Sequence, residues 1–469
     1  MTFDKEKSAF TSLKSSVHRI TILISSFRLI LRRKESFKLT GKQYMIEASK
    51  ISNSFTKYQI FIIAILSFIQ FTVILDFMVI APLGAMLLGI LNITPAQFGW
   101  IVSAYAFSAG ISGLLAAGFA DKYDRKKLLL FFYSGFVIGT LLCGIATDFH
   151  FLLIARIVTG LFGGVIASVS LAIVTDLFSF EQRGRVMGFV QMSFAVSQVA
   201  GIPFGIYLAN SLGWHAPFLL IVGISAAVGI VIMMRMQPVD KHLTAEHAVQ
   251  HNSFVHLRNT VSHYQYRKAF ATTALLTIGG FLLMPFSSAF LVNNIAISQA
   301  QLPLVFMFTG IASMIVLPMV GRISDTVGKF KIFVIGTILA SIMIIIFTHL
   351  SVTPLWEIII VNIILFAGIM SRMIPATALM TAVPDLKDRG AFMSVNSSLQ
   401  QISGGVASIF AGAIIVQHAS NGPLEHYDTL GYICVGLMFL CIALLYEIDK
   451  HVEHKMKTAP QHSSASEHA

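Results

Sequence analysis

Long apolar runs separated by short polar stretches form the main pattern of this 469-residue chain. Each run is long enough to cross a hydrocarbon core of about 30 Å as a helix of about 20 residues. Because lipid offers the backbone no hydrogen-bond partners, the pattern predicts an all-α membrane protein. The twelve predicted transmembrane helices are 59–84, 96–120, 127–147, 150–177, 185–211, 214–236, 268–293, 302–324, 331–350, 354–382, 390–417 and 430–448.

The polar stretch 237–267 divides these spans into two sets of six. We expect an N-terminal bundle over 58–236 and a C-terminal bundle over 268–449, with this stretch as their linker. A tail over 1–57 precedes the first bundle, and a second tail over 450–469 follows the other.

The two sets of spans share an internal repeat. Arg183 and Arg389, each followed by glycine, lie 206 residues apart, and Asp121 and Asp325 lie 204 residues apart. A common offset predicts two pseudo-symmetric six-helix bundles around a central path.

Lys and Arg are distributed unevenly along the chain, which has a formal net charge of +11. Connections after the even-numbered spans carry Lys or Arg, whereas those after the odd-numbered spans carry none. The positive-inside rule therefore places both termini and the linker in the cytoplasm. The basic tail 1–57 is expected to contact anionic lipid headgroups and not nucleic acid. Met45 is an alternative start that would shorten this tail.

Several protein classes are excluded by composition and motifs. With 55% hydrophobic residues, the chain is far more apolar than soluble domains. It has no GxxxxGK[ST], GxSxG or HExxH motif, so we expect neither an ATP-driven pump nor a hydrolase. Its three cysteines lie inside apolar runs without metal-ligand spacing. We expect no enzyme activity, no metal and no cofactor.

Charged residues inside the membrane are rare and costly, so each is a functional candidate. Asp76 in the first span and Arg156 in the fourth lie at similar depth, about 27 Å from the cytoplasmic side for Asp76 at 1.5 Å per residue. Pairing with Arg156 favours the ionised carboxylate, and separation favours its protonation. The pair is expected either to couple protons to transport or to join two helices permanently. Arg372 is expected to bind an anionic substrate or to pair helices.

Neutral polar residues on apolar spans are further candidates for substrate binding. Such side chains can line a cavity and hydrogen-bond a solute, or they can bridge helices. The residues selected for substrate binding are Tyr105, Gln191, Asn293 and Gln401.

Three motifs add to this pattern. The connection after the second span contains Asp121, Arg125 and Lys126, and the connection after the eighth contains Gly321, Asp325, Gly328 and Lys329. In the fifth span, Gly201, Pro203 and Gly205 remove side-chain bulk and one backbone donor, which predicts close helix approach with a kink.

On these motifs the chain resembles the major facilitator superfamily, specifically its twelve-helix drug/proton antiporter branch and the arabinose-efflux-permease-like members. Asp124 departs from the family loop motif, which has glycine there. The resemblance implies proton coupling by Asp76 and Arg156. It also implies gating contacts of Asp121 with the start of the eleventh span, near Arg389, assisted by Arg125, and of Asp325 with the start of the fifth, near Arg183. The segment with Gly201, Pro203 and Gly205 would then prevent leak.

These features together predict a secondary active transporter that moves a small organic solute by alternating access, with the proton gradient as its energy source. Proton-coupled efflux by antiport is the main interpretation, and proton-coupled uptake of a sugar or metabolite, or a transport-fold sensor, are the alternatives. We expect a monomeric, multi-pass protein of a bacterial inner membrane, whose partners are solute, protons and membrane lipids.

Overall fold

The computed structural model describes residues 55–116, 122–240, 243, 259–385, 388–419 and 421–458. The chain divides into two units, Met1–Tyr58 and Gln59–Ala469, and the second contains nearly all of the described residues. Nearly all of the predicted basic tail, most of the predicted linker and the gating candidate Asp121 lie outside them.

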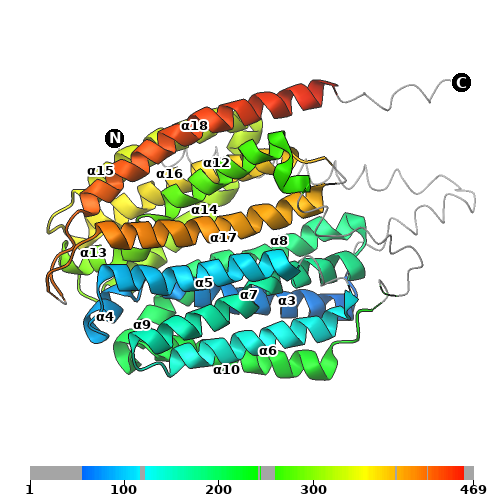
Figure 1. Cartoon of the computed structure of the whole chain (residues 1–469), viewed down its shortest axis with the longest axis horizontal. Helices are drawn as coiled ribbons and strands as arrows, with labels where there is room; N and C mark the ends of the chain where they lie inside the picture. Colours follow the sequence, from blue (N-terminus) through cyan, green and yellow to red (C-terminus); the bar gives the residue numbers. More distant parts are fainter. Residues whose placement is uncertain are drawn as a thin grey trace, which may run out of the picture. The chain divides into compact units, whose positions relative to one another are not determined.

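The first half of the fold consists of helices joined by short turns (Figure 1). Asp148 caps α7, where its carboxylate accepts hydrogen bonds from two backbone N–H groups. Gly213, with a φ of 94°, ends α9, because a left-handed backbone favours glycine. The elements are α3 (Lys57–Val79), α4 (Gly84–Ile90), α5 (Pro95–Ala116), α6 (Arg125–Gly144), α7 (Phe149–Leu177), α8 (Phe180–Val196), the π-helix η2 (Ser197–Gly201), α9 (Ile202–Leu212) and α10 (Ala216–Arg235).

The second half repeats this arrangement. Gly328, with a φ of 111°, ends α14 and precedes α15, so one glycine makes the whole turn. The elements are α12 (Tyr264–Phe281), the 3-10 helix η4 (Met284–Phe286), α13 (Ser287–Asn293), α14 (Leu302–Val327), α15 (Lys329–Thr348), α16 (Leu355–Ala382), α17 (Arg389–Ile414) and α18 (Tyr427–Thr458).

Eleven helical segments among the described residues are long and apolar enough to cross a membrane, and they coincide with eleven of the predicted spans. The remaining predicted span, 390–417, is the 26-residue helix α17, which is rich in Ser, Gln and Gly. α17 packs against α5 and α12, so many of its polar residues contact protein and not lipid. The described residues contain no strand. The prediction of an all-α membrane protein is confirmed.

Two helices differ from their predicted form. The predicted span 59–84 is divided into α3 and α4 around Pro82, and the predicted span 268–293 is divided into α12, η4 and α13 around Pro285. Proline removes a helical hydrogen bond, which allows the chain to turn at these points. The two prolines lie 203 residues apart, so the breaks are equivalent in the two halves.

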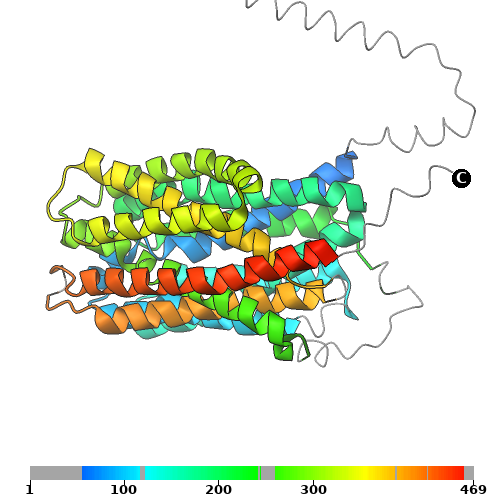
Figure 2. The same cartoon turned by 90° about the horizontal axis from the view of Figure 1, so that it is seen from above.

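The predicted span 430–448 is the middle of the longer helix α18, which lies beside α12 and α15 (Figure 2).

The halves meet through equivalent helices. α17 packs along α5, as Figure 1 shows, and α14 packs against α9 and η2. These are the second and fifth spans of each half, as two-fold pseudo-symmetry requires. The Ser103 hydroxyl donates a hydrogen bond to the Gly405 carbonyl at 2.7 Å across the first contact. A Cβ atom at Gly310 would lie 3.0 Å from Val199 Cα across the second.

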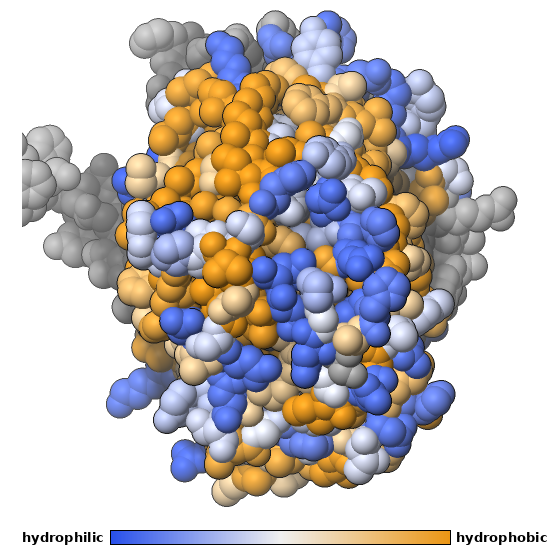
Figure 3. Space-filling model, turned by 90° about the vertical axis from the view of Figure 1, so that its left-hand side faces the viewer, coloured by the Kyte–Doolittle hydropathy of each residue, from blue (hydrophilic) through white to orange (hydrophobic). Residues whose placement is uncertain are grey.

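The two ends of the helices differ in charge. We call the end that carries Arg125, Arg183, Lys329 and Arg389 the basic end, and the end that carries α4 and α13 the opposite end. Figure 3 shows the opposite end, where polar side chains gather over the middle and apolar ones lie toward the upper edge. Between the two ends, large apolar side chains such as Phe131 are exposed, as lipid contact requires.

Candidate functional site

Asp76 and Arg156 form an ion pair inside the first half. Asp76 lies one turn before the end of α3, and Arg156 lies two turns after the start of α7. Arg156 Nη1 donates to Asp76 Oδ2 at 2.9 Å and to the Asp76 carbonyl oxygen at 3.3 Å. Both side chains are 0% exposed. The structure therefore brings together the two residues selected for proton coupling.

Three further side chains surround this pair. Thr140 Oγ1, on α6, donates to Asp76 Oδ1 at 3.2 Å. The Arg156 guanidinium lies over the Tyr105 ring, 4.6 Å from its centroid, which adds a cation–π contact. The ring of Phe77 packs against Tyr105 at a centroid distance of 5.2 Å. Tyr105, selected for substrate binding, is thus a direct neighbour of the pair.

Glycines on α7 allow α5 to come this close. A Cβ atom at Gly160 would lie 2.4 Å from the Tyr105 carbonyl oxygen, and one at Gly163 would lie 2.7 Å from the Tyr105 hydroxyl. Any larger residue at these positions would push α5 and α7 apart and move Tyr105 away from Arg156. The close contact at these glycines therefore holds Tyr105 over Arg156.

Arg156 has hydrogen-bonding capacity that the ion pair does not use. Its Nε and Nη2 atoms have no hydrogen-bond partner among the described residues. A buried donor without a partner is costly, so the site favours an additional acceptor, such as water or a solute atom. A proton on Asp76 would neutralise the carboxylate and leave the guanidinium without its anion. The arrangement can therefore link protonation to the contact between α3 and α7.

The predicted antiporter motif lies directly against the helix that carries Asp76. The chain forms the π-helix η2 over Ser197–Gly201, and Pro203 follows in the first turn of α9. A Cβ atom at Gly201 would lie 2.8 Å from Leu75 Cδ1, and one at Gly205 would lie 3.1 Å from Val79 Cγ2. The close approach expected from the sequence is confirmed, and the irregular turn takes the form of a π-helix.

Arg372, on α16, lies inside the contact of α16 with α15. Its Nε donates to Thr337 Oγ1 at 3.1 Å, and its guanidinium lies 5.6 Å from the centroid of the Phe333 ring. The side chain is 1% exposed, and Nη2 has no hydrogen-bond partner among the described residues. This geometry joins two helices, which was one of the two expectations for Arg372.

The other residues selected for substrate binding are dispersed. Gln191 is exposed on α8, and Asn293 is the last residue of α13 at the opposite end. Gln401 lies on α17 where it packs on α5, since a Cβ atom at Gly110 would be 3.4 Å from Gln401 Cβ. Among the described residues, none of these three hydrogen-bonds Asp76 or Arg156.

The first gating motif is tied to neighbouring helices of its own half. Arg125 Nε pairs with Asp176 Oδ2 on α7 at 3.2 Å. The ammonium group of Lys126 donates to the carbonyl oxygen of Met236, just after α10. The contact expected for Asp121 lies outside the described residues.

Asp124, where the loop departs from the family motif, has a clear structural role. Its Oδ1 atom accepts from the backbone N–H groups of Lys126 at 2.9 Å and Val239 at 3.0 Å. It therefore caps α6 and holds the residues that follow α10, where the predicted linker begins.

The second gating motif is arranged differently. Asp325 pairs with Lys329 one turn later, at 3.0 Å. Arg183, expected near Asp325, instead donates to the carbonyl oxygen of Thr175 at 2.7 Å. Arg389 makes the equivalent bond to the carbonyl oxygen of Thr381 at 3.3 Å, so the repeat extends to these contacts. Gly321 has no heavy atom within 4 Å of its Cβ position and is not packed against another helix there.

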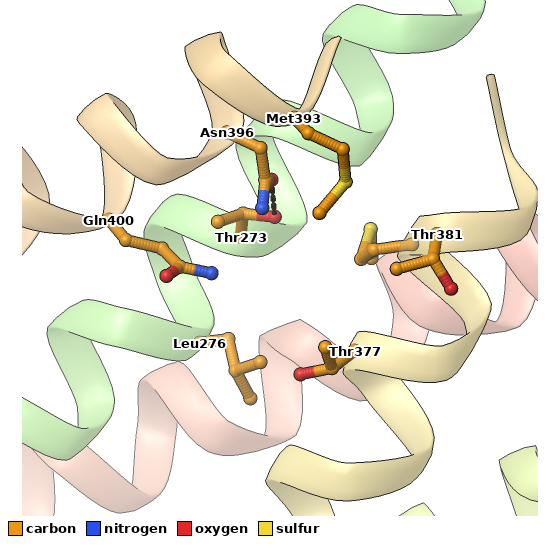
Figure 4. A pocket seen from close by; sticks show the side chains of 8 residues that line it. Thr273, Leu276, Thr377, Thr381, Met393, Asn396 and Gln400 are labelled. Atoms are coloured by element: carbon orange, nitrogen blue, oxygen red, sulfur yellow. Dashed lines mark hydrogen bonds between the residues drawn. The ribbon is translucent and has the colours of Figure 1, made fainter. Parts of the chain in front are cut away.

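A small pocket lined by both polar and apolar side chains lies in the second half, between α12, α16 and α17 (Figure 4). None of its residues was selected from the sequence, because Thr, Asn and Gln on apolar helices are as common at helix contacts as at sites. The eight described lining residues are Thr273, Leu276, Thr377, Met380, Thr381, Met393, Asn396 and Gln400.

The sequence matches the model of a known protein family. The family model of the Major Facilitator Superfamily matches residues 66–268 and again residues 269–467. The two matched stretches follow one another and together cover both halves of the described fold.

Curated relatives give similar results. The chain is 23% identical over 390 residues to the uncharacterized MFS-type transporter YbcL of Bacillus subtilis, which covers 82% of this chain and 95% of that protein. It is 24% identical over 272 residues to YceJ of the same organism, covering 58% of this chain and 68% of that protein. Multidrug resistance protein 3 of Bacillus subtilis is 33% identical over 130 residues, covering 28% of this chain and 25% of that protein.

Solved structures share the fold. A bacterial homolog of the human lysosomal transporter Spinster superposes with a TM-score of 0.61 at 15% identity, covering 86% of this chain and 98% of that one. The nucleoside transporter NupG superposes with a TM-score of 0.64 at 12% identity, and the superposition covers 83% of this chain and 99% of the NupG chain. At these identities the likeness concerns the fold alone.

Proposed function

Because this chain belongs to the major facilitator superfamily and is a secondary transporter, we propose that it exports a small organic solute in exchange for protons. The observation that carries this proposal is the fully buried Asp76–Arg156 pair, with its 2.9 Å contact inside a membrane-spanning half. Asp76 is the acid that takes up and releases the proton, and Arg156 is the cation whose partner changes.

The pair can couple protonation to conformation in a simple way. With Asp76 ionised, the pair is neutral overall and holds α3 against α7. Protonation leaves the Arg156 charge unpaired in a medium of low dielectric, which raises the free energy of this conformation. A conformation that gives the guanidinium water or another acceptor then becomes favoured. Proton binding from one side and release to the other would drive the alternating access.

Two observations support efflux. Gly201 and Gly205, in the antiporter motif, leave room for Leu75 and Val79, which lie before and after Asp76 on α3. Among the relatives, one is named multidrug resistance protein 3, and another is a probable sugar efflux transporter of Helicobacter acinonychis, 27% identical over 143 residues. Uptake is the second candidate, because the vacuolar membrane amino acid uptake transporter fnx2 of Schizosaccharomyces pombe is 31% identical over 150 residues.

The proposal includes an orientation. Lys and Arg gather at the basic end, so this end faces the cytoplasm by the positive-inside rule. Solute would enter from the basic end and protons from the opposite end, across a bacterial inner membrane. The energy source would be the proton gradient.

Asp76→Asn in proteoliposomes tests the proposal. We expect the variant to lose transport driven by a pH gradient across a panel of labelled solutes, because the amide cannot take up the proton. It should retain solute exchange at equal pH, since the fold and the solute path remain. Asp148→Asn, which neutralises an exposed acid at the opposite end, is the matched control and should transport like the wild type. Undiminished gradient-driven flux in Asp76→Asn would remove this residue from the mechanism.

A further inference from the structure

Two phenylalanines, one from each half, meet between α3 and α12. The rings of Phe77 and Phe281 lie 6.0 Å apart between their centroids, at an interplanar angle of 44°. Both side chains are partly buried. Phe77 lies two residues before the end of α3, and Phe281 is the last residue of α12, so each ring lies just before the break in its helix. The contact therefore joins the two halves at similar places.

The two residues are also equivalent in the repeat. They lie 204 residues apart, which is the offset that separates Asp121 from Asp325. Halves repeated in parallel are related by an axis along the membrane normal, and equivalent residues can touch each other only close to that axis. The path between the halves follows the same axis. The two rings therefore lie across this path.

The halves are also in contact beyond the rings, toward the opposite end. The Ser288 hydroxyl donates to the Ala81 carbonyl oxygen at 2.8 Å. A Cβ atom at Gly84 would lie 3.2 Å from the Pro285 carbonyl oxygen. Each contact joins residues whose equivalents, at the same offset of 204, make the other contact. The rings therefore form the inner edge of a contact that closes the path toward the opposite end.

On the first half, the ring of Phe77 reaches the candidate proton site. Phe77 directly follows Asp76 on α3, and its ring packs on Tyr105 at a centroid distance of 5.2 Å. The Arg156 guanidinium lies over the same Tyr105 ring, 4.6 Å from its centroid. Because these contacts are continuous, a movement of Arg156 or of α3 would displace the ring of Phe77.

On the second half, the ring of Phe281 is held where the two halves pack most closely. A Cβ atom at Gly404 on α17 would lie 3.4 Å from this ring. A Cβ atom at the next residue, Gly405, would lie 3.3 Å from Ala106 Cβ on α5. Apolar rings fixed in a narrow path offer water no hydrogen bonds, and such a constriction can exclude water and the protons that it carries.

We propose that Phe77 and Phe281 form an aromatic seal that separates Asp76 from the water of the opposite end in this conformation. The two phenylalanines are positioning residues, because they act on Asp76 through the access of water and through Tyr105. The inference rests on the proposed proton exchange and assigns to these rings the prevention of proton flow without solute. With the seal lost, protons from the opposite end reach Asp76 before the halves have changed conformation.

The test is proton flux into solute-free proteoliposomes with an acidic exterior, followed with an internal pH-sensitive dye while potassium and valinomycin balance the charge. We expect Phe77→Ala and Phe281→Ala each to raise this flux about two- to tenfold, the effect of one lost aromatic contact on the population with an open seal. Phe281→Leu, which keeps an apolar side chain of similar bulk, should remain near the wild-type flux, and Phe281→Val should lie between Leu and Ala.

Phe68→Ala is the matched control. The Phe68 side chain is 53% exposed and lies nine residues before Phe77, on the opposite face of α3. The control removes the same ring away from the seal and should give the wild-type flux. Exchange of solute at equal pH, which every variant should retain, shows that the variants are folded, and Phe281→Val serves as the test if Phe281→Ala does not fold.

A double variant shows whether the leaking protons pass through Asp76. Adding Asp76→Asn to Phe281→Ala should return the solute-free flux to the wild-type rate, because the amide cannot take up the proton. A merely structural role of the ring would not make the leak depend on this carboxylate.

Four outcomes would overturn the inference: wild-type flux in the folded variants, equal flux in Phe281→Leu and Phe281→Ala, an equal leak in Phe68→Ala, or a leak that persists after Asp76→Asn is added. Each leaves the proposed function standing if Asp76→Asn alone abolishes gradient-driven transport. Undiminished gradient-driven transport by Asp76→Asn would instead reject the proposed function itself.

Discussion

At the residue scale, a few polar groups in an apolar chain account for the candidate chemistry. Asp76 and Arg156 could be paired from the sequence, because charges inside a membrane are so costly that two at one depth are expected to meet. Thr140, which also bonds Asp76, could not be selected, because a threonine on an apolar helix usually bonds its own backbone. Tyr105 was selected for another reason, and its place over Arg156 depends on glycine contacts that no spacing reveals.

Asp148 gives a prediction about pH at this scale. Backbone N–H groups of Phe151 and His150 donate to its carboxylate at 3.1 and 2.9 Å and hold its pKa below the usual range. Because the pKa of Asp148 is lower in the folded state, its ionised form stabilises the fold. This stabilisation is complete at pH values above the pKa of the unfolded state, about 3.9, and is lost as the pH falls through the pKa of the folded state. We expect Asp148→Ala to lower the unfolding temperature at pH 7, with a smaller difference from wild type at pH 3.

The matched variant is Asp148→Asn, whose amide oxygen can still cap α7 without charge. The unfolding temperature of Asp148→Asn at pH 7 should lie between those of the wild type and Asp148→Ala. Thermal unfolding followed by intrinsic fluorescence measures all three proteins. An unfolding difference between wild type and Asp148→Ala that stays constant from pH 7 to pH 3 would contradict this account of the cap.

At the scale of elements, the apolar runs fixed the helices but not their breaks. Pro82 and Pro285 interrupt their helices, whereas Pro318 and Pro375 lie inside continuous ones. Proline is tolerated in membrane helices when neighbours satisfy the freed carbonyl, so its presence alone does not decide between the two outcomes. At the first break, the Ser288 hydroxyl donates to the Ala81 carbonyl at 2.8 Å, and this partner belongs to the other half.

The contact between α5 and α7 gives a prediction about glycine. A Cβ atom at Gly164 would lie 2.3 Å from the Ala109 carbonyl oxygen, whereas Gly188 on α8 has no heavy atom within 4 Å of its Cβ position. We expect Gly164→Ala to destabilise the fold by about 1–3 kcal/mol through overpacking. Gly188→Ala, the same change at an open helical site, should be neutral or stabilising by about 0.5–1 kcal/mol. Reversible unfolding in mixed detergent measures both, and equal effects would contradict the packing described for α5 and α7.

At the scale of the whole molecule, the repeat relates the contacts as well as the sequence. The bonds from Arg183 to Thr175 and from Arg389 to Thr381 are equivalent in the two halves. The sequence predicted the two halves from such offsets. It could not predict which helices join them or where a pocket forms, because those depend on side chains from several spans meeting in space.

The bond between Ser288 and Ala81 gives a prediction about conformation, because it joins the halves toward the opposite end. Ser288→Ala should favour the conformation open at that end by about 1 kcal/mol, or about fivefold in population. Ser287→Ala is the matched control, since the Ser287 hydroxyl bonds Met284 within its own half. Spin labels attached at Leu212→Cys in the first half and Val352→Cys in the second, both exposed positions near the opposite end, measure the distance between the halves there. Equal distance distributions in the two variants would show that this bond does not control closure.

Proton movement driven by solute is the most direct measurement of the central claim that Asp76 exchanges protons for solute. Proteoliposomes are loaded with a transported solute and a pH-sensitive dye, at equal pH on both sides, and diluted into solute-free buffer. Antiport predicts that solute efflux brings protons inward, so the interior acidifies in the wild type and not in Asp76→Asn. Alkalinisation of the interior would indicate symport, and solute efflux without any change of pH would contradict proton coupling altogether.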